Sequence, residues 1–200
     1  MSVLRLLLPA VAVAALSVLG ACGEDTGQPA EERSVESPSA FDAATATLSD
    51  QPFCETVDIT LVAGALGMPA DQVELLEDSG VDEELPSTRR VNSCAFGSTE
   101  KRLVMTVQPR RAEAAVERRI DKYRNDERSC QVADDSWFGS PGVVADCEGG
   151  GAPREVAVTG LVGSSGFFCS AVVDAGVGPE LHDATVEVCR DTLETLGIPD

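Results

Sequence analysis

The sequence is poor in the residues and motifs that mark most catalytic sites. Its 200 residues include one histidine, one tryptophan and one tyrosine, and aromatic residues amount to 4%. No GxSxG, SxxK or HExxH motif is present, so the usual signatures of serine hydrolases and zinc peptidases are missing. Cationic residues are also few, since 15 lysines and arginines face 34 acids for a net charge of −19. That charge argues against nucleic acid as a partner.

A CxxC motif is also missing, which excludes a thioredoxin-like redox motif and a zinc knuckle. Six of the seven cysteines fall in the C-terminal three quarters of the chain: Cys54, Cys94, Cys130, Cys147, Cys169 and Cys189. In an oxidising compartment these six can form three disulfides, in several connectivities that the sequence does not decide. We favour a sequential pairing: Cys54–Cys94, Cys130–Cys147 and Cys169–Cys189. We expect no metal and no cofactor.

Long apolar runs are confined to the N-terminus. The run LLLPAVAVAALSVL follows Met1 and Arg5 and ends at the small residues Gly20 and Ala21. This is the layout of a signal peptide over residues 1–21, and the run is too short for a spanning helix. No later stretch reaches about 18 consecutive apolar residues, so we expect no second membrane segment.

Residues 22–50 form a polar segment rich in Glu, Ser, Pro, Ala and Gly. Such a composition cannot bury enough apolar surface to offset the entropy of ordering, so we expect a disordered linker. It is either a stalk that holds a domain away from a surface or a frayed N-terminus. We expect residues 51–200 to form a single domain.

Hydrophobic periodicity predicts an α+β fold for this domain. Asp58 is expected to cap a short helix that ends at Gly67, and residues 69–76 are expected to add one or two helical turns. The clearest helix covers residues 110–126, and a last helix runs from Glu180 to Leu196. Strands are expected at six places: 92–98, 102–109, 130–135, 142–147, 154–162 and 167–174.

The order of these elements predicts a mostly antiparallel sheet with helices packed on one face, stapled by disulfides. Each half of the domain ends in a helix, which suggests a pseudo-repeat. In the sequential pairing, one disulfide closes a hairpin around SWFGSPG and another joins a strand to the final helix.

The cationic residues are concentrated in one segment. Eleven of the 15 lysines and arginines lie between Arg89 and Arg128, beside only six acids. Five of them form a candidate patch for an anion or an acidic partner: Arg110, Arg111, Arg118, Arg119 and Lys122. The alternative is a solvated helix face that offsets an acidic body, which is the usual role of a charge run.

Three further features have a functional and a structural interpretation. The acidic stretch from Asp78 to Glu84 is either a loose calcium site or a solvated loop, and its glycine is misplaced for an EF-hand. His182 is either a general base or a surface histidine, and no partner nucleophile is evident. Trp137 and Phe138 either line a ligand groove or anchor a loop in the core.

The residues Leu19-Gly20-Ala21-Cys22 resemble a bacterial lipobox. The resemblance implies cleavage between Ala21 and Cys22 and acylation of the Cys22 thiol. The acylated N-terminus would anchor the protein to the extracytoplasmic face of the cell membrane, because several acyl chains give stable attachment.

The folded part resembles the uncharacterised small cysteine-stapled α+β lipoproteins of actinobacteria. The matching residues are Cys54, Val57-Asp58, Val62, Leu66-Gly67 and Cys94-Ala95-Phe96. It departs from that pattern in its third cysteine pair and in Phe96, where tryptophan is frequent. A more distant similarity is to extracellular sensor domains of actinobacterial Ser/Thr kinases, which implies ligand sensing as a class.

Taken together, these features favour a non-enzymatic cell-envelope lipoprotein whose domain binds a ligand or a protein partner. This hypothesis predicts an apolar cleft between the sheet and a helix. The alternatives are an envelope enzyme, such as a hydrolase with an unrecognised site, and a purely structural spacer.

Overall fold

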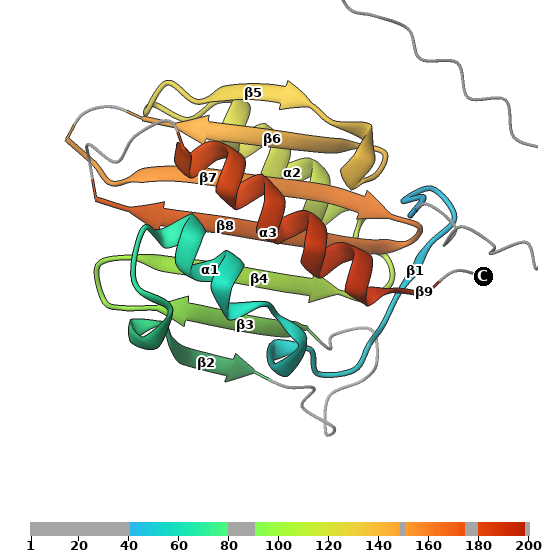
Figure 1. Ribbon diagram of the computed structural model, residues 1–200. Coiled ribbons are helices and arrows are strands. Elements are labelled where there is room, and N and C mark those ends of the chain that lie inside the picture. Colours follow the sequence, from blue (N-terminus) through green and yellow to red (C-terminus); the bar gives the residue numbers. More distant parts are fainter. Residues whose placement is uncertain (1–40, 80–90, 149–150, 175–179, 199–200) are drawn as a thin grey trace, which may run out of the picture. The chain divides into compact units, whose positions relative to one another are not determined.

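A seven-stranded antiparallel sheet forms the centre of the domain (Figure 1). The computed structural model describes residues 41–79, 91–148, 151–174 and 180–198. Across the sheet the strand order is β2-β3-β4-β8-β7-β6-β5. The strands are β2 (Glu74–Ser79), β3 (Asn92–Gly97), β4 (Arg102–Gln108), β5 (Gln131–Asp134), β6 (Gly142–Cys147), β7 (Arg154–Val162) and β8 (Ser165–Val173). Three helices, α1 (Ile59–Leu66), α2 (Glu113–Arg124) and α3 (Glu180–Leu196), complete the α+β fold that the sequence predicts.

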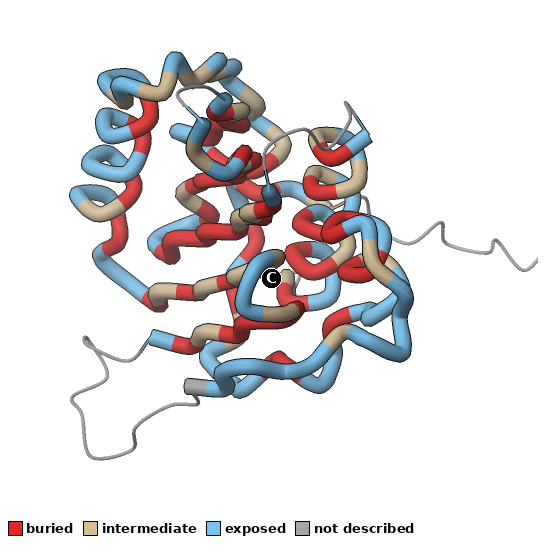
Figure 2. The backbone as a smooth tube through the Cα atoms, turned by 90° about the vertical axis from the view of Figure 1, so that its left-hand side faces the viewer, coloured by how far each residue is buried: buried red, intermediate tan, exposed pale blue. Residues whose placement is uncertain are grey.

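The helices cover both faces of the sheet, which corrects the expectation that they pack on one. In Figure 1, α1 and α3 lie in front of the sheet and α2 lies behind it, and in Figure 2 helices stand on both sides of the strands. On the α2 side, Ala112, Val116 and Ile120 pack against Val143 of β6 and Phe168 of β8.

The reason is that the second half of the sheet is apolar on both faces. Along β8, Phe167 and Cys169 face α1 and α3, while Phe168 faces α2. A strand that is apolar on both faces must be covered on both, whereas β4 alternates. In β4, Leu103, Met105 and Val107 are buried, and the residues between them are only half-buried.

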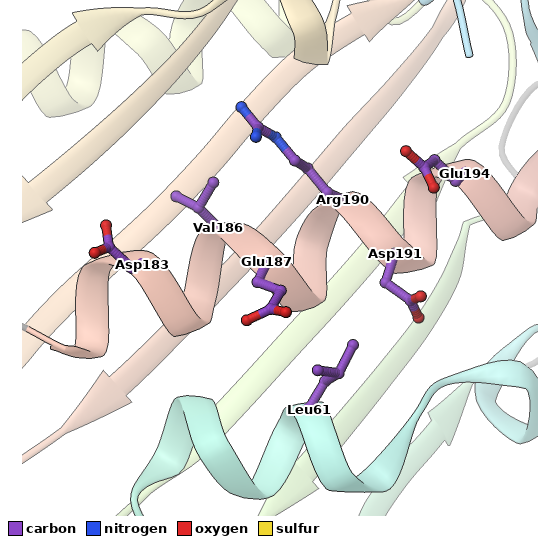
Figure 3. Close-up of a pocket in the computed structure, with 7 residues that line it drawn as sticks. All are labelled: Leu61, Asp183, Val186, Glu187, Arg190, Asp191 and Glu194. Atoms are coloured by element: carbon purple, nitrogen blue, oxygen red, sulfur yellow. The ribbon is translucent and has the colours of Figure 1, made fainter. Parts of the chain in front are cut away.

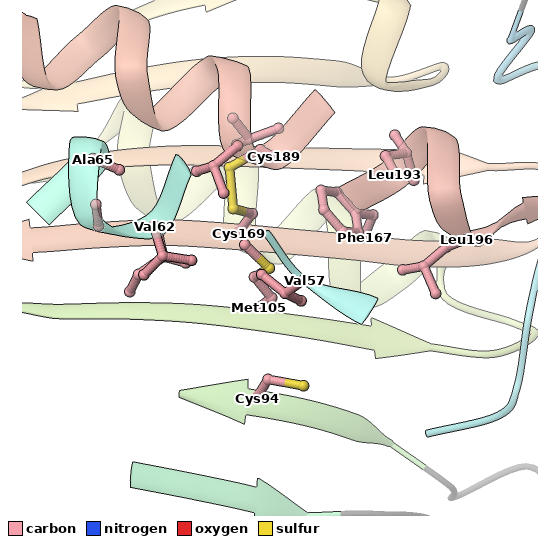
Figure 4. Close-up of a cluster of buried hydrophobic side chains, with 14 of the residues drawn as sticks. Val57, Val62, Ala65, Cys94, Met105, Phe167, Cys169, Cys189, Leu193 and Leu196 are labelled. Carbon is pink, nitrogen blue, oxygen red and sulfur yellow. A yellow bond between two sulfur atoms is a disulfide. The ribbon is translucent and has the colours of Figure 1, made fainter. Parts of the chain in front are cut away.

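The main core lies between the sheet and the helices α1 and α3 (Figure 4). Figure 4 shows the side chains that converge there: Val62 and Ala65 from α1, Cys189, Leu193 and Leu196 from α3, and Met105, Phe167 and Cys169 from the sheet. As predicted, Asp58 caps α1 by accepting hydrogen bonds from the backbone N–H groups of Thr60 and Leu61. Gly67 ends α1 with φ of 57°, the left-handed conformation that glycine adopts without strain.

The strands, but not the helices, have the symmetry of a repeat. Each half contributes a three-stranded antiparallel meander, β2-β3-β4 and β6-β7-β8, and the two meet where β4 pairs with β8. The helices that follow these meanders, α2 and α3, lie on opposite faces. The predicted pseudo-repeat therefore describes the sheet only.

The domain begins earlier in the chain than expected. Residues 41–50, which the sequence analysis assigned to the linker, pack on the domain, and Ala43, Ala46 and Leu48 are buried in its core. A short strand β1 (Thr47–Leu48) pairs antiparallel with β9 (Gly197–Ile198) after the last helix. The polar composition of residues 41–50 does not indicate that they belong to the domain, because their buried residues are few and mostly small.

The three disulfides follow the sequential connectivity. Cys54 is bonded to Cys94, joining the turn before α1 to β3. The other two are Cys130–Cys147, which joins the residue before β5 to β6, and Cys169–Cys189, which joins β8 to α3. The hairpin around SWFGSPG and the strand-to-helix staple are both present.

One element differs in type. Residues 69–76 were expected to be helical, but only a single 3-10 turn forms at Ala70–Gln72, and Glu74 already starts strand β2. Pairing with β3 outweighs the local helical preference of a leucine-rich stretch. Among the described residues, no helix is both long enough and apolar enough to cross a bilayer.

Candidate functional site

A hollow of about 350 Å³ lies between α2 and the half of the sheet that α2 leaves open. We call it the α2 groove. Its walls and floor are Thr106 and Gln108 of β4, Phe168 of β8, and Ala115, Arg118, Arg119 and Lys122 of α2. The four helix residues are spaced three and four apart, so they form one face of α2. The hollow lies between a helix and the sheet, as expected, but it combines apolar surface with a polar and basic one instead of being apolar throughout.

Three of the five residues of the predicted cationic patch line this groove. Arg118, Arg119 and Lys122 are exposed at its rim. The other two, Arg110 and Arg111, are exposed in the connection between β4 and α2, at one end of the helix, and do not line the groove.

These five cations differ from the other arginines in their partners. Five other arginines of the described chain form salt bridges with carboxylates: Arg102, Arg124, Arg128, Arg154 and Arg190. Within the described ranges, none of the five patch residues has a carboxylate within 4.0 Å. Of the described cations that have no carboxylate partner, all but Lys101 therefore lie on α2 or in the connection that precedes it, in a protein with 34 acids.

Like charges are also neighbours along α2. Arg118 and Lys122 are four residues apart, as are the members of a separate acidic row formed by Glu113, Glu117 and Asp121. Like charges at this spacing destabilise a helix by about 0.2–0.5 kcal/mol per pair. Most charges of the helix are thus separated by sign, although Asp121 is three residues from both Arg118 and Arg124.

The floor of the groove joins an aromatic ring to polar side chains. Thr106 of β4 lies directly opposite Phe168 of β8 in the sheet register. The guanidinium of Arg119 lies 5.3 Å from the centroid of the Phe168 ring, a cation–π contact that fixes this arginine over the floor. On the other side of Thr106, its hydroxyl is 3.1 Å from the Ser93 hydroxyl of β3.

Two strained residues connect the groove strand to α2. Arg110 and Arg111 have φ angles of 62° and 52°, in the left-handed region. This conformation costs about 1–2 kcal/mol for a residue with a side chain, and glycine adopts it freely. Arginine nevertheless occupies both positions.

A buried network fixes the far end of α2. The Tyr123 hydroxyl donates a hydrogen bond of 3.0 Å to Glu155, and Arg128 donates one of 2.7 Å to the other oxygen of that carboxylate. Burial, reinforced by the Glu155 charge, raises the pKa of Tyr123 above its usual 10. Arg128 also binds Asp126, and this hydrogen bond lowers the pKa of Asp126 to about 2.

A second hollow, of about 390 Å³, lies between α1 and α3 on the opposite face (Figure 3). Its lining residues are Leu61, Asp183, Val186, Glu187, Arg190, Asp191 and Glu194. Its only cation, Arg190, is 3.3 Å from Asp135, which lies outside the hollow. This acidic surface is a row of carboxylates along α3 and shows no buried polar group aimed at a ligand.

Trp137 and Phe138 anchor a loop and do not line either groove. Phe138 is fully buried, and Trp137 packs with its ring centroid 5.0 Å from those of Phe41 and Phe138. The guanidinium of Arg190 lies 5.0 Å from the Trp137 ring centroid. The structural interpretation of this aromatic pair is therefore the one supported.

His182 lies beside a salt bridge. Its Nδ1 is 3.5 Å from Asp146, and Asp146 accepts a hydrogen bond of 2.7 Å from Arg154. The Asp146 carboxylate is therefore shared between Arg154 and the His182 imidazole.

In the described part of the chain, one group has ligand atoms at metal-binding separations. Asp126, Cys130 and Cys147 offer atoms within 4.8 Å of one another. The two sulfurs are joined in a disulfide and Asp126 is paired with Arg128, so this set does not suit a metal ion.

Several sequence predictions fall on residues outside the described ranges. These are the signal peptide over residues 1–21, the cleavage site between Ala21 and Cys22, the lipidation of Cys22, the disorder of residues 22–40, and the calcium interpretation of the acidic stretch, of which only Asp78 and Ser79 are described, both in β2.

The floor of the α2 groove was missed by the sequence analysis. Its signal was the alternation in RLVMTVQ, which marks one face of β4 as only half-covered. Comparison of the chain with protein-family models, with curated proteins and with solved structures gave no match.

Proposed function

We propose that this protein is a lipid-anchored, non-enzymatic protein of the cell envelope that binds an anionic ligand or partner in the α2 groove. The signal-peptide pattern and Cys22 support the anchor and the location. The observation that supports the binding site is the gathering of unpaired cations at a hollow, within a strongly acidic protein.

Two features of α2 support binding rather than solvation alone. A cationic face that only balanced the acidic body would be more stable if its arginines alternated with Glu113, Glu117 and Asp121. The left-handed connection would be more stable with glycine in place of Arg110 and Arg111. In both places the chain keeps an arrangement that costs stability, which is typical of functional surfaces.

The acidic body does not prevent an anion from approaching this groove. At physiological ionic strength the Debye length is about 8 Å, so distant charges are screened. The carboxylate row of α3 lies on the opposite face of the sheet, and the local charge at the groove is positive.

Binding of a simple anion tests the site. The full chain in detergent is titrated with pyrophosphate by calorimetry, and the paired variant Arg118→Ala/Lys122→Ala is compared with Arg102→Ala/Arg124→Ala. Both pairs remove two exposed cations, but only the first pair belongs to the groove. We expect binding to be lost in the first pair and kept in the second; equal binding by both variants, or none by the wild type, would disprove the site.

Metabolic labelling with palmitate tests the anchor. We expect label in the wild-type chain and none in Cys22→Ala, which should also leave the membrane fraction. An unlabelled wild-type chain would rule out lipidation at Cys22.

A further inference from the structure

This inference rests on the proposed binding of anions in the α2 groove. We infer that the ligand is a linear polyanion, a chain of repeated phosphate groups that lies along α2, rather than a compact anion. The step from anion to chain follows from how the five cations are distributed.

The cations are spread over a length that no compact anion spans. Lys122 is nine residues from Glu113, the first residue of α2, which corresponds to about 14 Å at the rise of an α-helix, and Arg110 and Arg111 precede the helix. A single phosphate reaches only neighbouring side chains, such as Arg118 and Lys122, which are four residues apart. A ligand that contacts both the groove and the Arg110–Arg111 end must therefore be extended.

Exposure of the cations leads to the same conclusion. Arg118, Arg119 and Lys122 are all exposed, and an ion pair between exposed groups contributes little because water and salt screen it. Useful affinity at such a surface comes from several contacts made by one molecule, so that each later contact is intramolecular. A chain with regularly spaced charges provides these contacts.

The floor of the groove disfavours an acidic peptide. Peptides often bind by adding a strand to a sheet edge, but β4 is paired on both sides, with β3 and with β8. The floor offers side chains instead, namely the Thr106 hydroxyl and the Gln108 amide. Four of the five cations are arginines, whose planar guanidinium suits phosphate oxygens.

Two sources have the required chemistry: free linear polyphosphate, and a polymer whose units are joined by phosphodiester bonds. The acidic row of α2, formed by Glu113, Glu117 and Asp121, repels either chain from the other side of the helix. This repulsion confines the chain to the groove side.

The test measures affinity against chain length. The full chain in detergent is titrated with pyrophosphate, with tripolyphosphate, with linear polyphosphate longer than the helix, and with poly(glycerol phosphate). We expect affinity to rise at least tenfold from pyrophosphate to the long chains, with a steeper salt dependence because more counterions are released. Whichever of linear polyphosphate and poly(glycerol phosphate) binds more tightly identifies the class of the natural ligand.

The double variant Arg110→Ala/Arg111→Ala distinguishes the linear ligand from the anion site in the groove, because these two residues lie outside the groove. We expect this variant to weaken the long chains several-fold and to leave pyrophosphate binding unchanged. If pyrophosphate binds as tightly as the long chains but still depends on Arg118 and Lys122, the linear ligand is wrong and the anion site stands. If neither pyrophosphate nor any chain binds, the proposed function itself fails.

Poly-glutamate of the same length as the phosphate chains is titrated as the control for an acidic peptide ligand. Tighter binding of poly-glutamate than of both phosphate chains would overturn the phosphate class. Weaker binding supports it.

Discussion

Tyr123 provides a direct probe of the network that fixes α2. It is the only tyrosine in the chain, so the near-ultraviolet absorbance of tyrosinate reports this side chain alone. The residue is 2% exposed, and its hydroxyl donates to Glu155 at 3.0 Å. Burial and the adjacent carboxylate both disfavour the phenolate, which is why the pKa of Tyr123 lies above its usual 10.

The sign of the pH dependence follows from that shift. A group whose pKa is raised by folding contributes stability that is complete below its unfolded pKa. As the pH rises through 10 toward the raised pKa, the unfolded state loses its proton first and this contribution is lost. We therefore expect little tyrosinate signal near pH 10 while the protein remains folded, and the signal to appear together with alkaline unfolding.

Two substitutions give the magnitude. Tyr123→Phe keeps the buried ring and removes a hydrogen bond to a charged group, which contributes about 1.5–3 kcal/mol in general. Glu155 keeps its contact with Arg128, so we expect a loss in the free energy of unfolding near the lower end, about 1–2 kcal/mol. Glu155→Gln removes the second cause only, so the pKa should fall but remain above 10.

Chemical denaturation and an absorbance titration, followed in parallel with circular dichroism, measure these quantities. Tyr123→Phe is the spectral control, since it should show no titration at all. A tyrosinate transition centred near pH 10 in a chain that is still folded would refute the buried network. Pyrophosphate binding by Tyr123→Phe should equal that of the wild type, because Tyr123 does not line the α2 groove.

Three further predictions concern stability. Gly160→Ala places a Cβ against the backbone carbonyl of a 3-10 turn, so it should reduce soluble expression sharply, and normal yield would contradict this packing. Replacing Cys169 and Cys189 together by alanine should lower the free energy of unfolding by about 3 kcal/mol from loop entropy alone, as measured by denaturant unfolding against the wild type. An unchanged free energy of unfolding would show that this disulfide does not stabilise the fold. Arg128 lowers the pKa of Asp126 to about 2, so the Asp126 carboxylate should contribute stability above about pH 4 that is lost as the pH falls toward 2. In Asp126→Asn the free energy of unfolding should therefore depend less on pH over this range. An unchanged pH dependence would contradict the pairing with Arg128.

The strands were predictable where one face is apolar and the other polar. In RLVMTVQ the alternation located β4 and its buried face, and the Asp58 and Gly67 signals located both ends of α1. Sequential disulfides were favoured, and two of them close a local unit: the hairpin between Cys130 and Cys147, and the strand and helix joined by Cys169 and Cys189. These features depend on residues that are close together in the sequence, so they can be predicted from the sequence.

The placement of α2 depended on information that a single strand shows only indirectly. FFCSAVV was identified as a strand, but its unbroken apolar run also indicates cover on both faces, which requires a helix behind the sheet. Strand β2 was missed for a different reason: its three acids and two leucines lack clear alternation, and only pairing with β3 defines it. The groove depends on both, since it exists where α2 covers one half of the sheet and leaves β4 half-covered.

The cationic patch was recognised from composition, but its meaning depended on partners. Charge counting alone did not separate a binding face from a solvated one. The structure adds that Arg118, Arg119 and Lys122 have no carboxylate partner in the described parts of the chain, whereas Arg102 and Arg124 do. Pairing is a tertiary property, because the partners come from Glu77 and Asp134 on other elements.

If α2 keeps its separated charges for binding, rearranging them should improve stability at the expense of affinity. The double substitution Glu117→Arg/Arg118→Glu leaves the net charge unchanged and affects only exposed positions. It converts three like-charge pairs into opposite-charge pairs, Glu113–Glu117, Glu117–Asp121 and Arg118–Lys122, and it converts one opposite-charge pair, Arg118–Asp121, into a like-charge pair. The net gain is two favourable conversions, so we expect the free energy of unfolding to rise by about 1–2 kcal/mol.

The same double substitution places an acid at the rim of the α2 groove, so pyrophosphate binding should be lost. Denaturation and calorimetry on one preparation measure both effects, and the single substitution Glu117→Gln, which relieves two acidic contacts without touching the groove, should raise stability and keep binding. A double variant that is more stable and still binds would show that the charge separation of α2 has no role in binding. A double variant that is less stable would show that the separated charges are the more stable arrangement of this helix, and the argument from their cost would fail.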